Sequence, residues 1–135
     1  MTETGKDLSE RSERIICLIP MKLPGLNEYV GACRANRYAG AEMKKRIEAD
    51  ISLFVRRLPR FEYPIFIHFH WTEDNRRRDY DNIAFGKKFI LDALVKQGRL
   101  KDDNRRYVTG FMDTFGYGEK ASVTIYIERS KNESD

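Results

Sequence analysis

The sequence predicts an α+β fold in which helices pack against one mixed sheet of about four strands, in the chain order β-α-β-α-β-β. Two patterns support this fold class: short apolar runs that alternate with a period of two, and longer stretches with apolar residues every three or four positions. With 135 residues, of which 41% are hydrophobic, the chain can bury one modest core. We therefore expect residues 1–135 to form a single domain with loose polar ends at about 1–13 and 130–135.

Four stretches are typical of strands. Residues 15–19 form a continuous apolar run that ends at Pro20, and its length and β-branched content predict a buried strand. Residues 65–72 alternate and have two apolar-rich faces, which predicts a central strand. Strands are also expected at 107–115 and 121–128, and the short turn at 116–120 between them favours a β-hairpin.

Two stretches have helical spacing, and Pro24 and Gly25 are a loop signal within residues 21–29. The first helix is expected at 40–57, with its solvated face at Lys44, Lys45 and Glu48. The second is expected at about 81–97, with Gly98 as its C-terminal cap. A glycine inside a helix costs about 1 kcal/mol relative to alanine, so Gly86 suggests a close backbone approach.

Composition limits the possible functions. The formal net charge is +4 and the pI is about 9.1, which favours anionic partners without proving one. Cys17 and Cys33 match neither a disulfide framework nor a zinc spacing, so we expect reduced thiols. No stretch approaches the roughly 20 apolar residues of a membrane span, and the N-terminus lacks an apolar signal region. We expect a soluble, cytoplasmic protein without a membrane partner.

Asp79 and Asp81 follow directly after three arginines, Arg76, Arg77 and Arg78. On an extended segment, a spacing of two places both carboxylates on one side. Hard cations such as Mg²⁺ bind through one or two carboxylates plus substrate phosphates. The pattern therefore predicts a divalent metal beside a phosphate partner. The alternative, in which Asp81 is only a helix N-cap, explains neither Asp79 nor the arginines.

Two lysines follow in the expected helix. Lys88 lies seven residues after Asp81, almost two helical turns, and so shares its face, whereas Lys87 lies toward the apolar stripe. Lys88 is therefore the better candidate for contact with a phosphate. The alternative is a surface lysine paired with Asp92, an interaction worth only about 0.2–0.5 kcal/mol.

A third acidic point is the turn that contains Asp102 and Asp103. If this turn folds back toward the first two aspartates, three carboxylates could bind one or two metals and support phosphodiester cleavage. Aspartate is also common in turns for conformational reasons alone. His68 and His70 share one strand face, and we interpret them as half-covered strand residues, since no further Cys or His completes a zinc site.

Four segments together resemble the RusA family of Holliday-junction resolvases: PGLNEY, RRRDYDN, the lysine before FILDAL, and LKDD. The resemblance covers most of the chain, from residue 15 to the last strand. It implies that Asp79, Asp81 and Asp103 are catalytic metal ligands and that Lys88 is a catalytic lysine, with Asp102 and Lys87 as the adjacent alternatives. Arg78 matches the arginine before the first aspartate. The chain has three more residues than the family pattern between the DN pair and the lysine.

The resemblance implies a homodimeric, Mg²⁺-dependent endodeoxyribonuclease, with Mn²⁺ as a possible substitute, that resolves four-way DNA junctions by paired nicks in DNA recombination and repair. The residues expected to contact DNA are Arg76, Arg77, Arg78 and Lys87. Two alternatives remain open: a structure-selective DNA-binding protein without catalysis, and a metal-dependent hydrolase of small phosphoesters.

Overall fold

The computed structural model describes residues 14–130. The strands are β1 (Ile15–Ile19), β2 (Ile65–Glu73), β3 (Val108–Tyr117) and β4 (Ser122–Arg129), and the helices are α2 (Leu26–Ala35), α3 (Ala39–Val55), α4 (Tyr80–Ala84) and α5 (Lys87–Lys96). The expected loose ends at 1–13 and 131–135 lie outside the described residues. Ser130 is held, because its N–H donates to the carbonyl oxygen of Pro64 at 2.9 Å.

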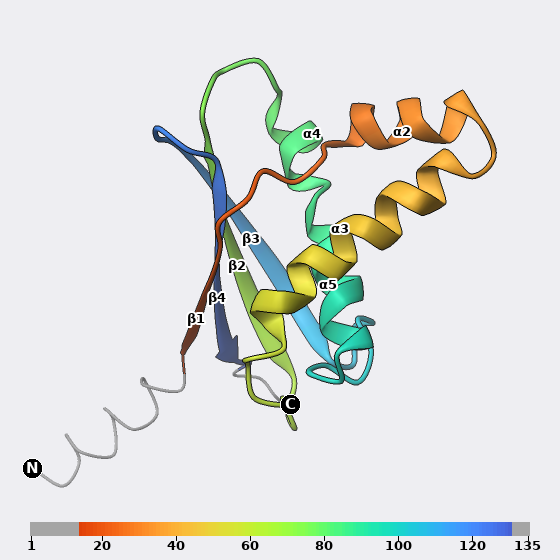
Figure 1. Cartoon of the computed structure of the whole chain (residues 1–135). Coiled ribbons are helices and arrows are strands. Elements are labelled where there is room, and N and C mark those ends of the chain that lie inside the picture. Colours follow the sequence, from red (N-terminus) through yellow and green to blue (C-terminus); the bar gives the residue numbers. More distant parts are fainter. Residues whose placement is uncertain (1–13, 131–135) are drawn as a thin grey trace, which may run out of the picture.

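The four strands form one mixed sheet in the order β1-β4-β2-β3, which confirms the α+β class (Figure 1). Strand β4 pairs antiparallel with β1 and β2, whereas β2 and β3 are parallel. The prediction that 107–115 and 121–128 form a hairpin is wrong, because β2 lies between β3 and β4. In this position the side chains of Val123, Ile125 and Ile127 on β4 are buried on the face of the sheet that the helices cover.

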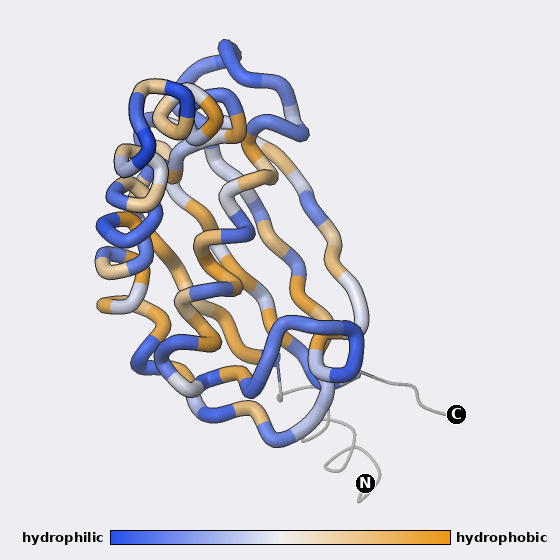
Figure 2. The backbone as a smooth tube through the Cα atoms, turned by 90° about the vertical axis from the view of Figure 1, so that its right-hand side faces the viewer, coloured by the Kyte–Doolittle hydropathy of each residue, from blue (hydrophilic) through white to orange (hydrophobic). Residues whose placement is uncertain are grey.

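The helices cover one face of the sheet (Figures 1 and 2). Along β2, the side chains of Ile65, Ile67, Phe69 and Trp71 are buried, and those between them are half-buried. The central position predicted for this strand is therefore confirmed. On the opposite face Ile16 and Leu18 are exposed.

Two helical predictions need correction. No helix is expected at residues 26–35 from the loop signal at Pro24 and Gly25, yet they form α2, and none of its residues is buried. The single helix expected at 81–97 is two helices, because the chain turns at Phe85 and Gly86. Around that turn the N–H groups of Gly86, Lys88 and Phe89 bond three residues back rather than four.

Gly86 makes the close approach that the sequence suggests. A Cβ atom at this position would lie 3.2 Å from both the Leu23 side chain and the Trp71 ring. Gly98 has a φ of 71° after the end of α5, which confirms its role as a C-terminal cap.

The solvated face predicted for α3 is wrong for Glu48, which is 2% exposed. Its carboxylate lies between α3 and α5, 3.3 Å from the Lys44 ammonium and 3.0 Å from that of Lys96. Lys44 also lies 3.1 Å from Asp92. No helix in the described part of the chain is both long enough and apolar enough to cross a membrane.

Candidate functional site

The site is built on the loop that leaves β2 and enters α4, at residues 73–81. Its foundation is a bidentate ion pair between Arg78 and Glu73, the buried last residue of β2. Arg78 Nε donates to Glu73 Oε1 at 3.0 Å and Nη2 donates to Oε2 at 2.8 Å. Such fork-to-fork pairs are among the stronger hydrogen-bonded contacts in proteins and fix the direction of both groups.

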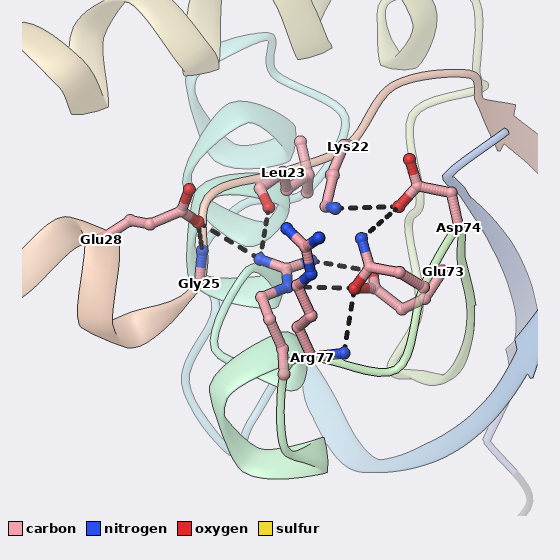
Figure 3. A network of polar contacts seen from close by, with 9 residues as sticks. Lys22, Leu23, Gly25, Glu28, Glu73, Asp74 and Arg77 are labelled. Carbon is pink, nitrogen blue, oxygen red and sulfur yellow. Dashed lines mark hydrogen bonds and ion pairs between the residues drawn. The ribbon is translucent and has the colours of Figure 1, made fainter.

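The Arg78 guanidinium also binds the segment around the start of α2, at Leu23 and Glu28, which Figure 3 labels. Arg78 Nη1 donates to the carbonyl oxygen of Leu23 at 3.1 Å and to Glu28 Oε1 at 3.3 Å. Glu28 in turn accepts the N–H of Gly25 at 2.7 Å. Two segments about 50 residues apart in the sequence, PGLNE and RRRDYDN, are therefore joined at one arginine.

Gly25 allows this close contact. A Cβ atom there would lie 2.6 Å from Asn82 Oδ1 and 2.9 Å from Arg78 Nη1. The same Asn82 oxygen accepts the N–H of Asn27, in the first turn of α2, at 2.9 Å. α2 and α4 are thus held together by backbone and amide groups, and the loop between β2 and α4 is fixed from both sides.

Asp79 and Asp81 project from this fixed loop and are both exposed. Asp79 is the residue before α4 and has an extended backbone, but its side chain makes no capping hydrogen bond. Asp81 lies in the first turn, where its carboxylate accepts the adjacent N–H of Asn82 at 2.9 Å. The alternative of Asp81 as the N-cap is wrong, because Asp79 holds that position. Within residues 14–130, neither carboxylate forms an ion pair.

The three arginines have different environments. Arg78 is committed to Glu73 and only 13% of its side chain is exposed. Arg76 and Arg77 are exposed, and Arg76 lies 4.1 Å above the ring centroid of Tyr117. The structure therefore leaves Arg76 and Arg77 open to a phosphate partner, while the contacts of Arg78 organise the loop.

The two lysines also differ. Lys87 donates to Asp113 Oδ2 at 2.6 Å and lies over the rings of Phe69 and Phe111. Lys88 is exposed and forms no ion pair with the described residues, so the alternative of a Lys88–Asp92 pair is wrong. The continuous helical phase expected between Asp81 and Lys88 is absent, since α4 and α5 are separate helices. The distinction between a half-buried Lys87 and an exposed Lys88 nevertheless holds.

Sequence reasoning missed Asp113. Its Oδ1 accepts the Trp71 Nε1–H at 2.9 Å, and its Oδ2 binds Lys87. A signal was available: Asp113 alternates with Phe111 and Phe115, so a strand there must place a carboxylate on the face that the helices cover.

Asp103 does not join Asp79 and Asp81 within one chain. It precedes β3, whose first residue lies beside Ile65 at the start of β2, whereas Asp79 follows the far end of β2. The nine residues of β2 separate these ends by roughly 26 Å at about 3.3 Å per residue. Correspondingly, the part of the chain that the structure describes contains no group of three or more Asp, Glu, His or Cys side chains that could hold a metal. Asp102 lies in the same distant turn, where Asn104 Nδ2 donates to it at 3.2 Å.

His68 and His70 lie on the sheet face opposite the helices and both contact Thr114 Oγ1, at 2.7 and 2.6 Å. Burial lowers the pKa of His68, and the adjacent His70 adds to this effect. Two imidazoles on one hydroxyl fit the interpretation as half-covered strand residues.

The loop at 73–81 thus presents two unpaired carboxylates, with cationic side chains nearby, on a rigid support. Asp79 and Asp81 fit the ligand set that Mg²⁺ uses when substrate phosphates and waters supply the remaining oxygens. Neither a protein-family model nor a curated protein sequence matches the chain.

Proposed function

We propose that the chain is a Mg²⁺-dependent endodeoxyribonuclease that acts as a homodimer on four-way DNA junctions, in DNA recombination and repair in the cytoplasm. One observation carries the proposal: Asp79 and Asp81 are exposed and unpaired within residues 14–130, on a loop that Arg78 fixes through its contacts with Glu73, Leu23 and Glu28. The resemblance of the surrounding motifs to the RusA family supports the substrate and the reaction.

Each residue then has a distinct role. Asp79 and Asp81 hold the metal, and Mn²⁺ can replace Mg²⁺. The bound metal supplies Lewis-acid stabilisation of the phosphate and a water of lowered pKa. Lys88 contacts a non-bridging oxygen of the scissile phosphate and stabilises the negative charge that develops on it. Arg76 and Arg77 neutralise neighbouring phosphates. Arg78 is a positioning residue, because its guanidinium is already bound to Glu73, Leu23 and Glu28.

The first experiment measures Mg²⁺-dependent nicking of a synthetic four-way junction against a linear duplex and a small phosphoester. We expect junction cleavage that Asp79→Asn and Asp81→Asn abolish, with junction binding retained, because each change removes a metal ligand and a charge that repels phosphate. The matched control is Asp50→Asn, an exposed aspartate on α3. Near-normal nicking by either site variant at saturating Mg²⁺ would exclude this metal site. Binding without any cleavage by the wild type would instead favour a DNA-binding protein.

The lysines provide a second experiment under single-turnover conditions. Lys88→Ala should slow nicking roughly 10²-fold or more, as when one transition-state donor is removed. Lys45→Ala, an exposed lysine on α3, is the control. Lys87→Ala should lower the melting temperature more than the rate, because it leaves Asp113 without its cation. The assignment fails if Lys87→Ala loses activity and Lys88→Ala keeps it.

The arginines are tested by the salt dependence of junction binding. Replacing both Arg76 and Arg77 by alanine should reduce the slope of log K against log salt by about 0.9 for each phosphate that is no longer neutralised. An unchanged slope would mean that Arg76 and Arg77 are only solvent-exposed loop residues and neutralise no phosphate.

A further inference from the structure

A cavity of about 350 Å³ lies at the end of the sheet where β2 and β3 begin, opposite the loop at 73–81 (Figure 1). Two segments form its walls: residues 60–64, which lead into β2, and residues 101–107, which lead into β3. Sites for small ligands commonly measure about 300–1,000 Å³. The lining combines three aromatic rings and three cations: Phe61, Tyr63, Tyr107, Arg60, Lys101 and Arg106.

Backbone hydrogen bonds hold the two walls in place. The N–H of Phe61 donates to the carbonyl oxygen of Arg99 at 2.8 Å, and the N–H of Ile65 donates to that of Tyr107 at 3.0 Å. Arg99 Nη1 also donates to the carbonyl oxygen of Leu58 at 2.8 Å. A cavity whose walls are already ordered loses little conformational entropy when a ligand enters it. The cavity is therefore pre-organised for a ligand.

Tyr107 offers the more accessible aromatic face in this cavity. Both Tyr63 and Tyr107 are half-buried, and a cation lies near each ring. The Arg129 guanidinium is 4.7 Å from the ring centroid of Tyr63, whereas the Lys101 ammonium is 6.0 Å from that of Tyr107. Since about 6 Å is the limit of direct contact between a cation and a ring, the face of Tyr107 is the less occupied. A tyrosine face of this kind can stack a nucleobase, because every base has a planar π-surface.

Two cations of the cavity have no anionic partner. Arg60 lies 3.6 Å from Glu62, the carboxylate that also lines the cavity, so these two charges offset each other. Lys101 and Arg106 form no ion pair within residues 14–130. The aspartates between them, at 102–103, do not line the cavity. An aromatic face beside unpaired cations matches the two parts of a nucleotide, the base and the phosphate.

We propose that this cavity binds a nucleotide, with the base stacked on Tyr107 and the phosphate held by Lys101 and Arg106. The ligand is either a free nucleoside monophosphate or an unstacked nucleotide within a DNA strand, because both present the same base and phosphate. The cavity lies at the opposite end of β2 from Asp79 and Asp81. Binding there therefore requires neither a metal at these two carboxylates nor cleavage of DNA.

Calorimetric titration in the presence of a chelator tests the two-part recognition. The probes are deoxyadenosine monophosphate, deoxyribose 5-phosphate, which lacks the base, and deoxyadenosine, which lacks the phosphate. The monophosphate should bind roughly 5- to 150-fold more tightly than deoxyribose 5-phosphate, which is the contribution of one stacked base. Its advantage over deoxyadenosine should shrink as the salt concentration rises, because salt screens the contact between cations and phosphate.

The two sources of a nucleotide are distinguished with a short abasic DNA strand that carries a single adenine, compared with the same strand without the adenine. If a DNA strand supplies the nucleotide, the adenine strand should bind more tightly than both the abasic strand and deoxyadenosine monophosphate. If a free nucleotide is the ligand, the monophosphate should bind more tightly than the adenine strand. Lack of any preference for the adenine, both in the monophosphate and in the strand, would overturn the proposal.

Substitutions locate the ligand. Arg106→Gln should weaken binding of the monophosphate roughly tenfold or more, because a charged hydrogen bond is lost. The matched control is Arg105→Gln, since this neighbour is also exposed but does not line the cavity. Tyr107→Phe should retain binding, whereas Tyr107→Leu should lose the roughly 5- to 150-fold contribution of stacking. Equal losses for the two arginine variants, or full binding by a folded Tyr107→Leu protein, would overturn the proposal.

The acidic site supplies the last comparison. Asp79→Asn and Asp81→Asn should bind deoxyadenosine monophosphate as the wild type does, because both residues lie at the other end of β2. Loss of nucleotide binding in these variants would place the ligand at the acidic site and overturn the proposal. A wild type that binds the monophosphate but does not nick DNA would instead count against the proposed nuclease alone.

Discussion

Glu73 and Glu48 are the two buried charged residues in the described part of the chain, at 4% and 2% exposure, yet their surroundings differ. Glu73 meets one planar guanidinium through two directed hydrogen bonds. Glu48 lies near the ammonium groups of Lys44 and Lys96, but neither of its oxygens accepts a directed hydrogen bond within residues 14–130. One buried carboxylate is fixed in direction, whereas the other is only neutralised.

The difference corresponds to position. Glu73 ends the central strand and supports the loop with the two unpaired aspartates, where a small displacement would misplace both. Glu48 lies between α3 and α5, where the fully buried side chains of Ile51, Ile90 and Leu94 already hold the two helices in place. Arginine holds a carboxylate in a set plane, whereas lysine supplies a mobile point charge. The loop that carries Asp79 and Asp81 is therefore supported by the arginine–glutamate pair, the more rigid of the two arrangements.

Among changes at the two buried carboxylates and their partners, Arg78→Ala should lower the free energy of unfolding most. It leaves Glu73 buried without a partner, and breaking a buried pair in this way costs roughly 3–5 kcal/mol of unfolding free energy. The measurement is urea unfolding followed by circular dichroism. Arg77→Ala, one residue away and exposed, should stay within about 0.5 kcal/mol of the wild type. Equal losses for the two variants would remove the distinction between the neighbouring arginines.

Arg78→Lys should have an intermediate effect. The charge is retained, but a lysine cannot form two parallel hydrogen bonds to Glu73 or reach Leu23 and Glu28 with the same group. The loss of at least one charged hydrogen bond to Glu73 predicts destabilisation of roughly 1.5–3 kcal/mol. Junction nicking should fall further than stability alone explains, because the aspartate loop is less well fixed. A lysine variant with wild-type stability would show that charge alone supports the loop.

Glu48→Leu should change stability little, by about 1 kcal/mol or less in either direction. The leucine fills apolar space between the helices, and the released Lys44 and Lys96, whose side chains are 33% and 63% exposed, can extend into water. The same urea series measures it. Destabilisation comparable to that of Arg78→Ala would mean that the two buried carboxylates are equivalent.

The smallest expected effect is a pH dependence from Lys44. Its hydrogen bond to Asp92 raises its pKa above the ordinary value of 10.5. A raised folded-state pKa gives stability that is fully present below 10.5 and is lost as pH rises through the folded value. Lys44→Met should therefore flatten the fall in melting temperature as the pH rises above 10.5. Parallel profiles for the two proteins would contradict this linkage.

The strands could be predicted from sequence because apolar runs and alternation mark them, and the expected bounds 15–19 match β1. The buried strand expected there is wrong, because β1 is an edge strand with Ile16 and Leu18 exposed. The pairing of the strands could not be predicted, because the alternation in β4 would suit either β2 or β3 as its neighbour.

α2 could have been predicted, since Leu26, Tyr29, Val30 and Cys33 recur at helical spacing, although none of them is fully buried. The loop signal of Pro24 and Gly25, just before its first residue, obscured this pattern.

At the site, the sequence indicated the exposed Asp79, Asp81 and Lys88 and the half-buried Lys87. It could not tell which of Arg76, Arg77 and Arg78 makes internal contacts and which two are exposed. The direction of each side chain depends on a loop whose shape is set by contacts with Leu23 and Glu73. Nor could it locate Asp103, whose place follows from the parallel pairing of β2 with β3.

The interior place of β4, the last strand, has a consequence for synthesis on the ribosome. Ile15 pairs with Ile127, so β1 has no strand to pair with until nearly the whole chain has been synthesised. Until residues 122–129 emerge, β2 has a partner only on its β3 side, and its other edge of backbone groups stays open. Such long-range pairing is slow and exposes unpaired strand edges. A nascent chain that stalls before residue 122 would therefore present two apolar strands, β1 and β2, to chaperones and to other chains.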